Sequence, residues 1–145
     1  MAHSYTNLIF HIVFGVKERR PLIDEEFQPR LHEYIGGTIR GLNGTSLEIG
    51  GVEDHVHILA KLAPTIAVSD FLEKLKASTS KWAKSVRGGF GWQEGYSAFT
   101  VSESQVERVG RYIQNQRKHH AKASFRDELI GLLEAHGVKY DPDRI

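Results

Sequence analysis

The sequence predicts an α+β fold in which an antiparallel sheet carries helices on one face. Four short segments have the apolar content of strands, and two longer segments repeat apolar residues at helical spacing. These segments follow one another as strand, helix, strand, strand, helix and strand. Because no linker, repeat or low-complexity stretch divides the chain, we expect residues 1–145 to form a single domain.

The first half of the chain predicts three strands and one helix. Residues 6–16 are apolar on both faces, which favours a strand in the centre of the sheet. Residues 27–42 place apolar side chains on one helical face, and an Asn-Gly pair follows as a stop signal. Two short strands are expected at 46–51 and 55–62, joined by a tight connection.

The second half completes the pattern. Residues 68–86 share one apolar face and end at an Arg-Gly-Gly stop, and residues 96–101 indicate the fourth strand. This element order is that of the split βαβ, or ferredoxin-like, fold. Val56 and Ile58 can supply the apolar, helix-covered face of the third strand, and we expect the opposite face to be open.

Two further helices are predicted beyond this unit. Ser102 and Gln105 form a capping-box pattern for a third helix that extends to about His120. Ser124 begins a fourth helix, which ends at Gly137. We treat both helices as C-terminal additions to the sheet and its two covering helices.

Composition limits the classes of protein that fit. A chain of 145 residues can bury roughly 70% of its unfolded surface, which is enough for one core. The absence of cysteine excludes disulfides and cysteine-ligated zinc, and the net charge of +1 excludes binding of nucleic acid by bulk charge. With no signal-peptide pattern or long apolar run, we expect a cytoplasmic protein without a membrane partner.

The segment His55-Val56-His57 is the first chemical signal. Side chains alternate faces along a strand, so the two imidazoles point the same way, roughly 7 Å apart at their roots. Two imidazoles on one face can each reach a divalent cation at about 2.1 Å. Alone, such a pair is more often a packing or surface feature.

The segment Tyr112 to Gln116 is the second signal. Positions four apart lie on one helical face, so the Tyr112 phenol would stand beside the Gln116 amide oxygen. Alone, Tyr112 fits a core tyrosine and Gln116 a solvated polar residue. Together with the histidine pair, they suggest metal-assisted attack of a tyrosine on a phosphodiester.

From end to end the chain resembles the single-tyrosine transposases of the HUH class, the IS200-like enzymes of compact bacterial insertion sequences. The class is named for histidine, hydrophobic residue, histidine, which matches His55-Val56-His57. Matching segments also include 17–22, 92–102, 112–120 and a closing stretch from Phe125 to Tyr140. The order and spacing of these segments are more specific than any one of them.

The resemblance implies a function and a site. Tyr112 would attack a DNA phosphate and form a 5′-phosphotyrosine link, while His55, His57 and Gln116 would hold Mg²⁺ or Mn²⁺. The substrate would be single-stranded DNA with hairpin ends. The family acts as a homodimer in which the tyrosine helix of one subunit commonly completes the histidine pair of the other, so a trans site is possible here.

Six residues are candidates for contacts to DNA: Lys17, Arg19, Arg20, Lys74, Lys81 and His119. The first three follow the opening strand, where they can meet phosphates. The two later lysines lie away from the apolar stripe of their helix, which also fits an ordinary solvated face. For His119, a favourable interaction with the helix dipole is the plainer interpretation.

Several other residues receive structural expectations. His11 is expected to be a hydrogen-bonded core histidine, and Asp54 to point away from His55. Trp82 is expected in the core, whereas Trp92 lies in a loop and is freer.

Two alternatives to a transposase remain open from sequence. One is a related HUH endonuclease that nicks single-stranded DNA at palindromic repeats or replication origins. The other is a non-catalytic nucleic-acid-binding module on a ferredoxin-like sheet. That module would display exposed aromatic residues on its central strands, where this chain has histidines.

Overall fold

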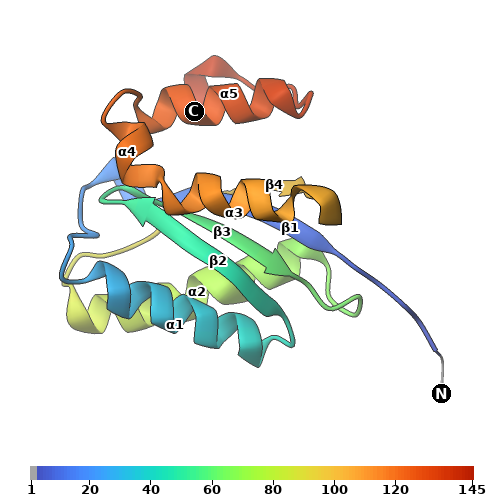
Figure 1. The fold of residues 1–145 in the computed structure, drawn as a ribbon. Coiled ribbons are helices and arrows are strands. Elements are labelled where there is room, and N and C mark those ends of the chain that lie inside the picture. The colour runs from blue at the N-terminus through green and yellow to red at the C-terminus, as the bar shows by residue number, and fades with distance from the viewer. Residues whose placement is uncertain (1–2) are drawn as a thin grey trace.

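A computed structural model describes residues 3–145, which contain an antiparallel four-stranded sheet with the strand order β2-β3-β1-β4 (Figure 1). This confirms the predicted α+β class and the central position of the first strand. The strands are β1 (Ile9–Gly15), β2 (Thr45–Val52), β3 (His55–Lys61) and β4 (Ser97–Thr100). The α-helices are α1 (Gln28–Gly41), α2 (Val68–Val86), α3 (Val106–Gln114), α4 (Gln116–His120) and α5 (Phe125–Ala135). Short 3-10 turns are η1 (Lys17–Arg19), η2 (Glu103–Gln105) and η3 (Pro142–Arg144).

Helices α1 and α2 cover one face of the sheet (Figure 1). The main core lies between them and the sheet, and β3 contributes Val56 and Ile58 to it, as the alternation of the strand predicts. Their β1 partners in the register, Phe14 and Ile12, point to the same side. The residues between them on β3, His55 and His57, therefore point to the opposite face.

That opposite face is not open, contrary to expectation. Helices α3, α4 and α5 lie over it, and both His55 and His57 are 0% exposed. Helix α3 approaches so closely that a Cβ added at Gly50 of β2 would lie 2.3 Å from the carbonyl oxygen of Ile113. The two C-terminal additions are thus the second cover of the sheet, so helices lie on both faces.

The predicted third helix is divided in two. Helix α3 ends at Gln114, Asn115 has non-helical backbone angles (φ −97°, ψ 22°), and α4 begins at Gln116. The capping-box expectation is also wrong, because the Ser102 hydroxyl is hydrogen-bonded to the Ser104 hydroxyl and caps no helix.

The cap expected at the start of the last helix is confirmed. The Asp127 amide donates to the Ser124 hydroxyl, and the chain leaves α5 through Gly137 at φ 66°. This cap fixes the first turn of α5, which lies directly over His55.

Across residues 3–145, no helix is long and apolar enough to cross a membrane.

Candidate active site

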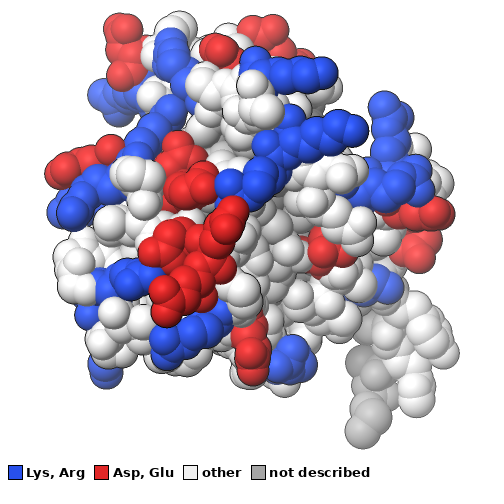
Figure 2. All heavy atoms as spheres, turned by 60° about the vertical axis from the view of Figure 1, so that its left-hand side comes forward, with Lys and Arg blue, Asp and Glu red and all other residues white. Residues whose placement is uncertain are grey.

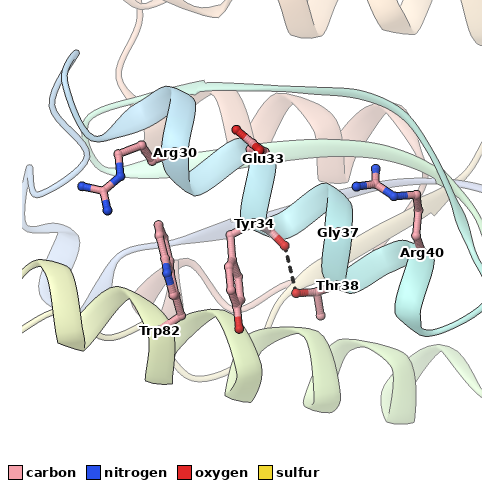
Figure 3. A pocket seen from close by; sticks show the side chains of 7 residues that line it. All are labelled: Arg30, Glu33, Tyr34, Gly37, Thr38, Arg40 and Trp82. Atoms are coloured by element: carbon pink, nitrogen blue, oxygen red, sulfur yellow. Dashed lines mark hydrogen bonds between the residues drawn. The ribbon is translucent and has the colours of Figure 1, made fainter.

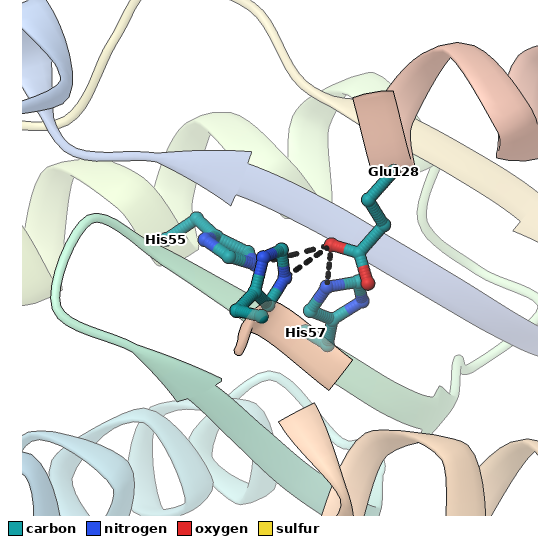
Figure 4. Close-up of side chains that lie close together, drawn as sticks. His55, His57 and Glu128 are labelled. Carbon is teal, nitrogen blue, oxygen red and sulfur yellow. Dashed lines mark hydrogen bonds and ion pairs between the residues drawn. The ribbon is translucent and has the colours of Figure 1, made fainter. Parts of the chain in front are cut away.

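Three histidines and one glutamate converge in the layer between the sheet and its C-terminal cover (Figure 4). His55 and His57 come from β3, His120 from the end of α4, and Glu128 from α5. Glu128 Oε1 lies 2.9 Å from His57 Nε2, 3.0 Å from His120 Nε2 and 3.2 Å from His55 Nε2. One ligand atom from each of the four residues lies within 4.8 Å of the other three.

The Glu128 carboxylate is the electrostatic centre of this cluster. Its side chain is 1% exposed. Burial opposes ionisation, but hydrogen bonds from His55 and His57 outweigh it and hold the pKa of Glu128 well below its usual range. The carboxylate is therefore a buried negative charge surrounded by imidazole groups.

Each strand histidine has a partner on its second ring nitrogen. His55 Nδ1 donates to Asp54 Oδ1 at 2.7 Å, and His57 Nδ1 shares a hydrogen bond of 2.8 Å with His11 Nε2. These partners direct the Nε2 atoms of both histidines toward the cluster. His11 is the buried, hydrogen-bonded histidine that the sequence predicts, and burial lowers its pKa to about 3.

The expectation that Asp54 points away from His55 is wrong. Asp54 lies in the turn between β2 and β3, so the alternation of a strand does not apply to it. Burial lowers the pKa of His55, but the hydrogen bonds to Asp54 and Glu128 outweigh it and raise that pKa above its ordinary value. The pKa of His57 is lowered, chiefly by its burial.

Tyr112 and Gln116 both reach this cluster. The Tyr112 hydroxyl donates a hydrogen bond to Glu128 Oε2, and its ring lies 5.7 Å from that of His57. Burial, and next the hydrogen bond to Glu128, raise the pKa of Tyr112 above its ordinary value. Gln116 is 1% exposed, and its Oε1 lies 3.3 Å from His55 Nε2 and 3.0 Å from His120 Nε2.

The donor set fits a divalent cation. Three imidazole nitrogens, a carboxylate and an amide oxygen face one small buried volume, and these are the ligand types that Mn²⁺ and related ions take. The Gln116 Nε2 atom is buried without a hydrogen-bond partner. The Gln116 amide therefore takes part in the cluster through its Oε1 atom, while its Nε2 atom stays unpaired.

Among the lysine and arginine candidates, Arg19 packs against a ring that stacks on His55. Its guanidinium is 4.8 Å from the centroid of the Phe125 ring, and Phe125 stacks on His55 at 4.0 Å with an angle of 3°. Arg19 and its neighbour Glu18 have positive φ values of 54° and 59°, an uncommon backbone geometry next to the site. Lys17 is exposed one residue before this pair.

Arg20 and His119 complete the candidates on this side. Arg20 is exposed, and its guanidinium donates to the Gly89 carbonyl at 3.4 Å. His119 Nε2 lies 3.5 Å from Glu128 Oε2, and the His119 side chain is 38% exposed. Figure 2 brings forward the end of the molecule where α4 lies in Figure 1, and there Lys and Arg alternate with Asp and Glu.

Lys74 and Lys81 are exposed on α2, which covers the other face of the sheet from the histidines. Any contact that they make with DNA would therefore be remote from the cluster.

The expectation for Trp92 is wrong, whereas Trp82 packs against the edge of the main core, where it stacks on Phe27. Trp92 is 8% exposed, and its indole nitrogen donates to the Thr79 hydroxyl at 2.8 Å, so it belongs to the core. Trp82 is half-buried and lines a hollow of about 560 Å³ with Arg30 and Tyr34, whose ring stacks on it at 4.6 Å (Figure 3).

Sequence reasoning missed two members of the cluster. A continuous helix to His120 gives no reason to place this residue beside His55, but the break at Asn115 starts a new helix whose last residue, His120, has its ring 4.6 Å from that of His55. Glu128 lies 71 residues from His57 along the chain, so no local pattern joins them. The sequence offers one signal for Glu128. It lies one turn after Phe125 on the apolar face of the predicted last helix, where a carboxylate is unusual.

Comparisons with known proteins identify the family of this chain. The sequence profile of the family described as "Transposase IS200 like" matches residues 4–116. The ISDra2 transposase TnpA of Deinococcus radiodurans is 27% identical over 119 residues, which are 75% of this chain and 84% of that protein. The transposase for insertion sequence element IS200 of Salmonella typhimurium is 29% identical over 128 residues, 80% of this chain and 81% of the relative.

A solved structure has the same fold. It is that of a REP-associated tyrosine transposase bound to a REP hairpin, with a TM-score of 0.62 and 13% identity. The match covers 85% of this chain and 74% of the solved one. Because the family profile spans the whole sheet and the segment from Tyr112 to Gln116, the chain belongs to the IS200-like transposase family.

Proposed function

We propose that this protein cleaves and rejoins single-stranded DNA through a covalent 5′-phosphotyrosine intermediate formed on Tyr112. The observation that carries this proposal is the place of the Tyr112 hydroxyl, which donates to the same carboxylate that binds His57. A nucleophile and a set of cation-binding atoms therefore lie within one hydrogen-bond network. An exposed, isolated tyrosine would not support this chemistry.

The reaction exchanges one phosphodiester for another. The Tyr112 oxygen attacks phosphorus, the bond from phosphorus to the 3′-oxygen breaks, and that oxygen leaves as a 3′-hydroxyl. His55, His57 and Gln116 would hold the cation, Mg²⁺ or Mn²⁺, which when bound would offset the charge that develops on the phosphate. Because the phosphotyrosine conserves the bond energy, a 3′-hydroxyl can reverse the reaction at a new junction without ATP.

The surroundings of Tyr112 oppose ionisation of its phenol. In the described arrangement the phenol is kept protonated, because burial and the Glu128 carboxylate both raise the pKa of Tyr112. Attack therefore requires that Tyr112 lose its proton. It also requires that positive charge offset the Glu128 carboxylate beside the phenol. A positive charge near the imidazoles favours both changes.

We further propose that the substrate has hairpin ends and lies in the cytoplasm. A protein of the same fold is solved with a REP hairpin, and Lys17, Arg19 and Arg20 supply positive charge on the side of the site. Phosphate contacts of this kind position DNA without reading its sequence. His119 would contact DNA at the rim of the site, and Lys74 and Lys81 would contact DNA that passes over α2.

We propose a homodimer with cis active sites. The contact network from Tyr112 through Glu128 to His57 within one chain supports cis assembly. The test mixes Tyr112→Phe chains with His57→Ala chains under conditions that exchange subunits. A cis arrangement predicts no recovery of cleavage, because no site then holds both groups. Recovery toward about a quarter of the wild-type activity would contradict it and indicate a trans site, because half of the randomly exchanged dimers would then hold one complete site of two.

The covalent step is tested with hairpin-containing single-stranded DNA, labelled at the end that stays with the 5′-phosphate, and Mn²⁺. Wild-type protein should form an adduct that survives denaturing electrophoresis, and a chelator should abolish it. Tyr112→Phe should form none. Tyr140→Phe is the matched control and should behave as wild type, because the Tyr140 hydroxyl bonds to Glu134 outside the cluster. An undiminished adduct in Tyr112→Phe would refute the proposed nucleophile.

A further inference from the structure

Resting on the proposed function, we propose that the Glu128 carboxylate of α5 is itself a ligand of the divalent cation. Helix α5 would then supply a charged member of a ligand set that otherwise consists of neutral imidazole and amide groups. The strand and tyrosine motifs do not indicate the position of this carboxylate.

The position of Glu128 is the first argument. Its Oε1 atom is within 3.2 Å of the Nε2 atoms of His55, His57 and His120. Figure 4 shows the carboxylate directed between the rings of His55 and His57. A cation with bonds of about 2.1 Å separates opposite ligand atoms by roughly 4.2 Å. The mutual distances of up to 4.8 Å in the cluster come near that limit, so small side-chain shifts suffice.

Charge is the second argument. His57 and Gln116 are buried, and neutral ligands alone would leave both positive charges of the cation uncompensated away from water. Glu128 places a negative charge at the same point, with a side chain that is 1% exposed. A buried carboxylate is itself costly unless it is paired, so a cation and this carboxylate stabilise each other.

The anchoring of α5 is the third argument. Phe125 stacks on His55, and Leu129 and Leu133 pack against Val13 and Phe99 of the sheet. Glu128 is therefore held by a helix that is itself fixed on both sides of it. Such fixation is what a metal ligand needs, because a freely rotating side chain would lose rotamer entropy on binding.

The same carboxylate links the cation-binding atoms to the nucleophile. Its second oxygen, Oε2, accepts the hydrogen bond of the Tyr112 hydroxyl. The carboxylate that would bind the cation through Oε1 therefore also contacts the proposed nucleophile through Oε2.

The test measures cation affinity without DNA, by titrating Mn²⁺ into the full chain and following the free Mn²⁺ signal by electron paramagnetic resonance. Wild type should bind one ion per chain, and Glu128→Gln should bind at least tenfold more weakly. Glu128→Asp, which keeps the carboxylate on a shorter stem, should fall between them. Glu134→Gln is the matched control on the outer side of α5 and should match wild type.

The outcomes separate this inference from the proposed function. If Glu128→Gln binds Mn²⁺ as wild type does while His57→Ala loses it, Glu128 is not a ligand although the metal site stands. If wild type binds no Mn²⁺, this inference and the metal site fail together, and the adduct assay still tests Tyr112 separately.

A variant that does not fold can be replaced by a measurement on the wild-type protein. Electron-nuclear double resonance of the Mn²⁺ complex, labelled with ¹³C at glutamate carboxylates, should show coupling to a carboxylate carbon. The absence of that coupling would overturn the inference.

Discussion

Removal of the Asp54 carboxylate tests how the site directs its histidines. Asp54 Oδ1 accepts from His55 Nδ1 at 2.7 Å, which leaves the His55 Nε2 lone pair for a cation. Loss of such a partner lowers metal affinity by about 10- to 100-fold. Because the Asp54 side chain is 29% exposed, water can partly replace it, so we expect the lower limit. Asp54→Ala should therefore weaken Mn²⁺ binding about tenfold, or about 1.4 kcal/mol.

The assay is the Mn²⁺ titration followed by paramagnetic resonance, with urea unfolding of each variant alongside it. Glu53→Ala is the matched control, because Glu53 lies in the same turn but pairs with Arg117 at 2.8 Å and not with a histidine. We expect Glu53→Ala to keep its Mn²⁺ affinity. An Asp54→Ala protein that binds Mn²⁺ like wild type would refute the orienting role.

Two further predictions concern stability. Burial lowers the pKa of His32 to about 4, below its unfolded value, so protonation favours the unfolded chain and stability falls as pH drops from about 6.5 toward 4. Between pH 7 and pH 5, His32→Gln should lose about 1 to 2 kcal/mol less free energy of unfolding than wild type, as measured by urea unfolding. An equal loss in both proteins would contradict this cause. Gly50→Ala should destabilise the protein by roughly 2 kcal/mol and reduce the Tyr112 adduct, because the new Cβ would strike the Ile113 carbonyl oxygen. Gly41→Ala is its control, because a Cβ added there meets nothing within 4 Å. Equal stability of the two variants would show that α3 moves to accommodate the new Cβ at no cost in free energy.

The strands and covering helices could be predicted because their apolar spacing is local. The face of β3 that holds Val56 and Ile58 follows from alternation alone, and so does the common direction of His55 and His57. The burial of these histidines could not be predicted in this way. The burial depends on where α3, α4 and α5 pack. The apolar faces of these helices do not indicate which surface of the sheet each helix covers.

Parts of the site depend on contacts between distant segments. Glu128 meets His57 only because α5 folds back over β1 and β4, and this requires knowledge of tertiary packing. The break at Asn115 was missed because the residues from Tyr112 to His120 contain neither Gly nor Pro, the usual signals for a helix end. Trp92 was misjudged because a loop residue can still enter the core when its nitrogen finds a partner such as Thr79.

The most direct test of the central claim is to find which residue carries the DNA. Trypsin should release Tyr112 in the six-residue peptide 112–117, between Arg111 and Arg117, which contains no other tyrosine. After reaction with hairpin DNA and nuclease digestion, mass spectrometry should find a 5′-linked nucleotide on this peptide. Attachment to a peptide that contains another tyrosine, or cleaved DNA without any attached peptide, would contradict attack by Tyr112.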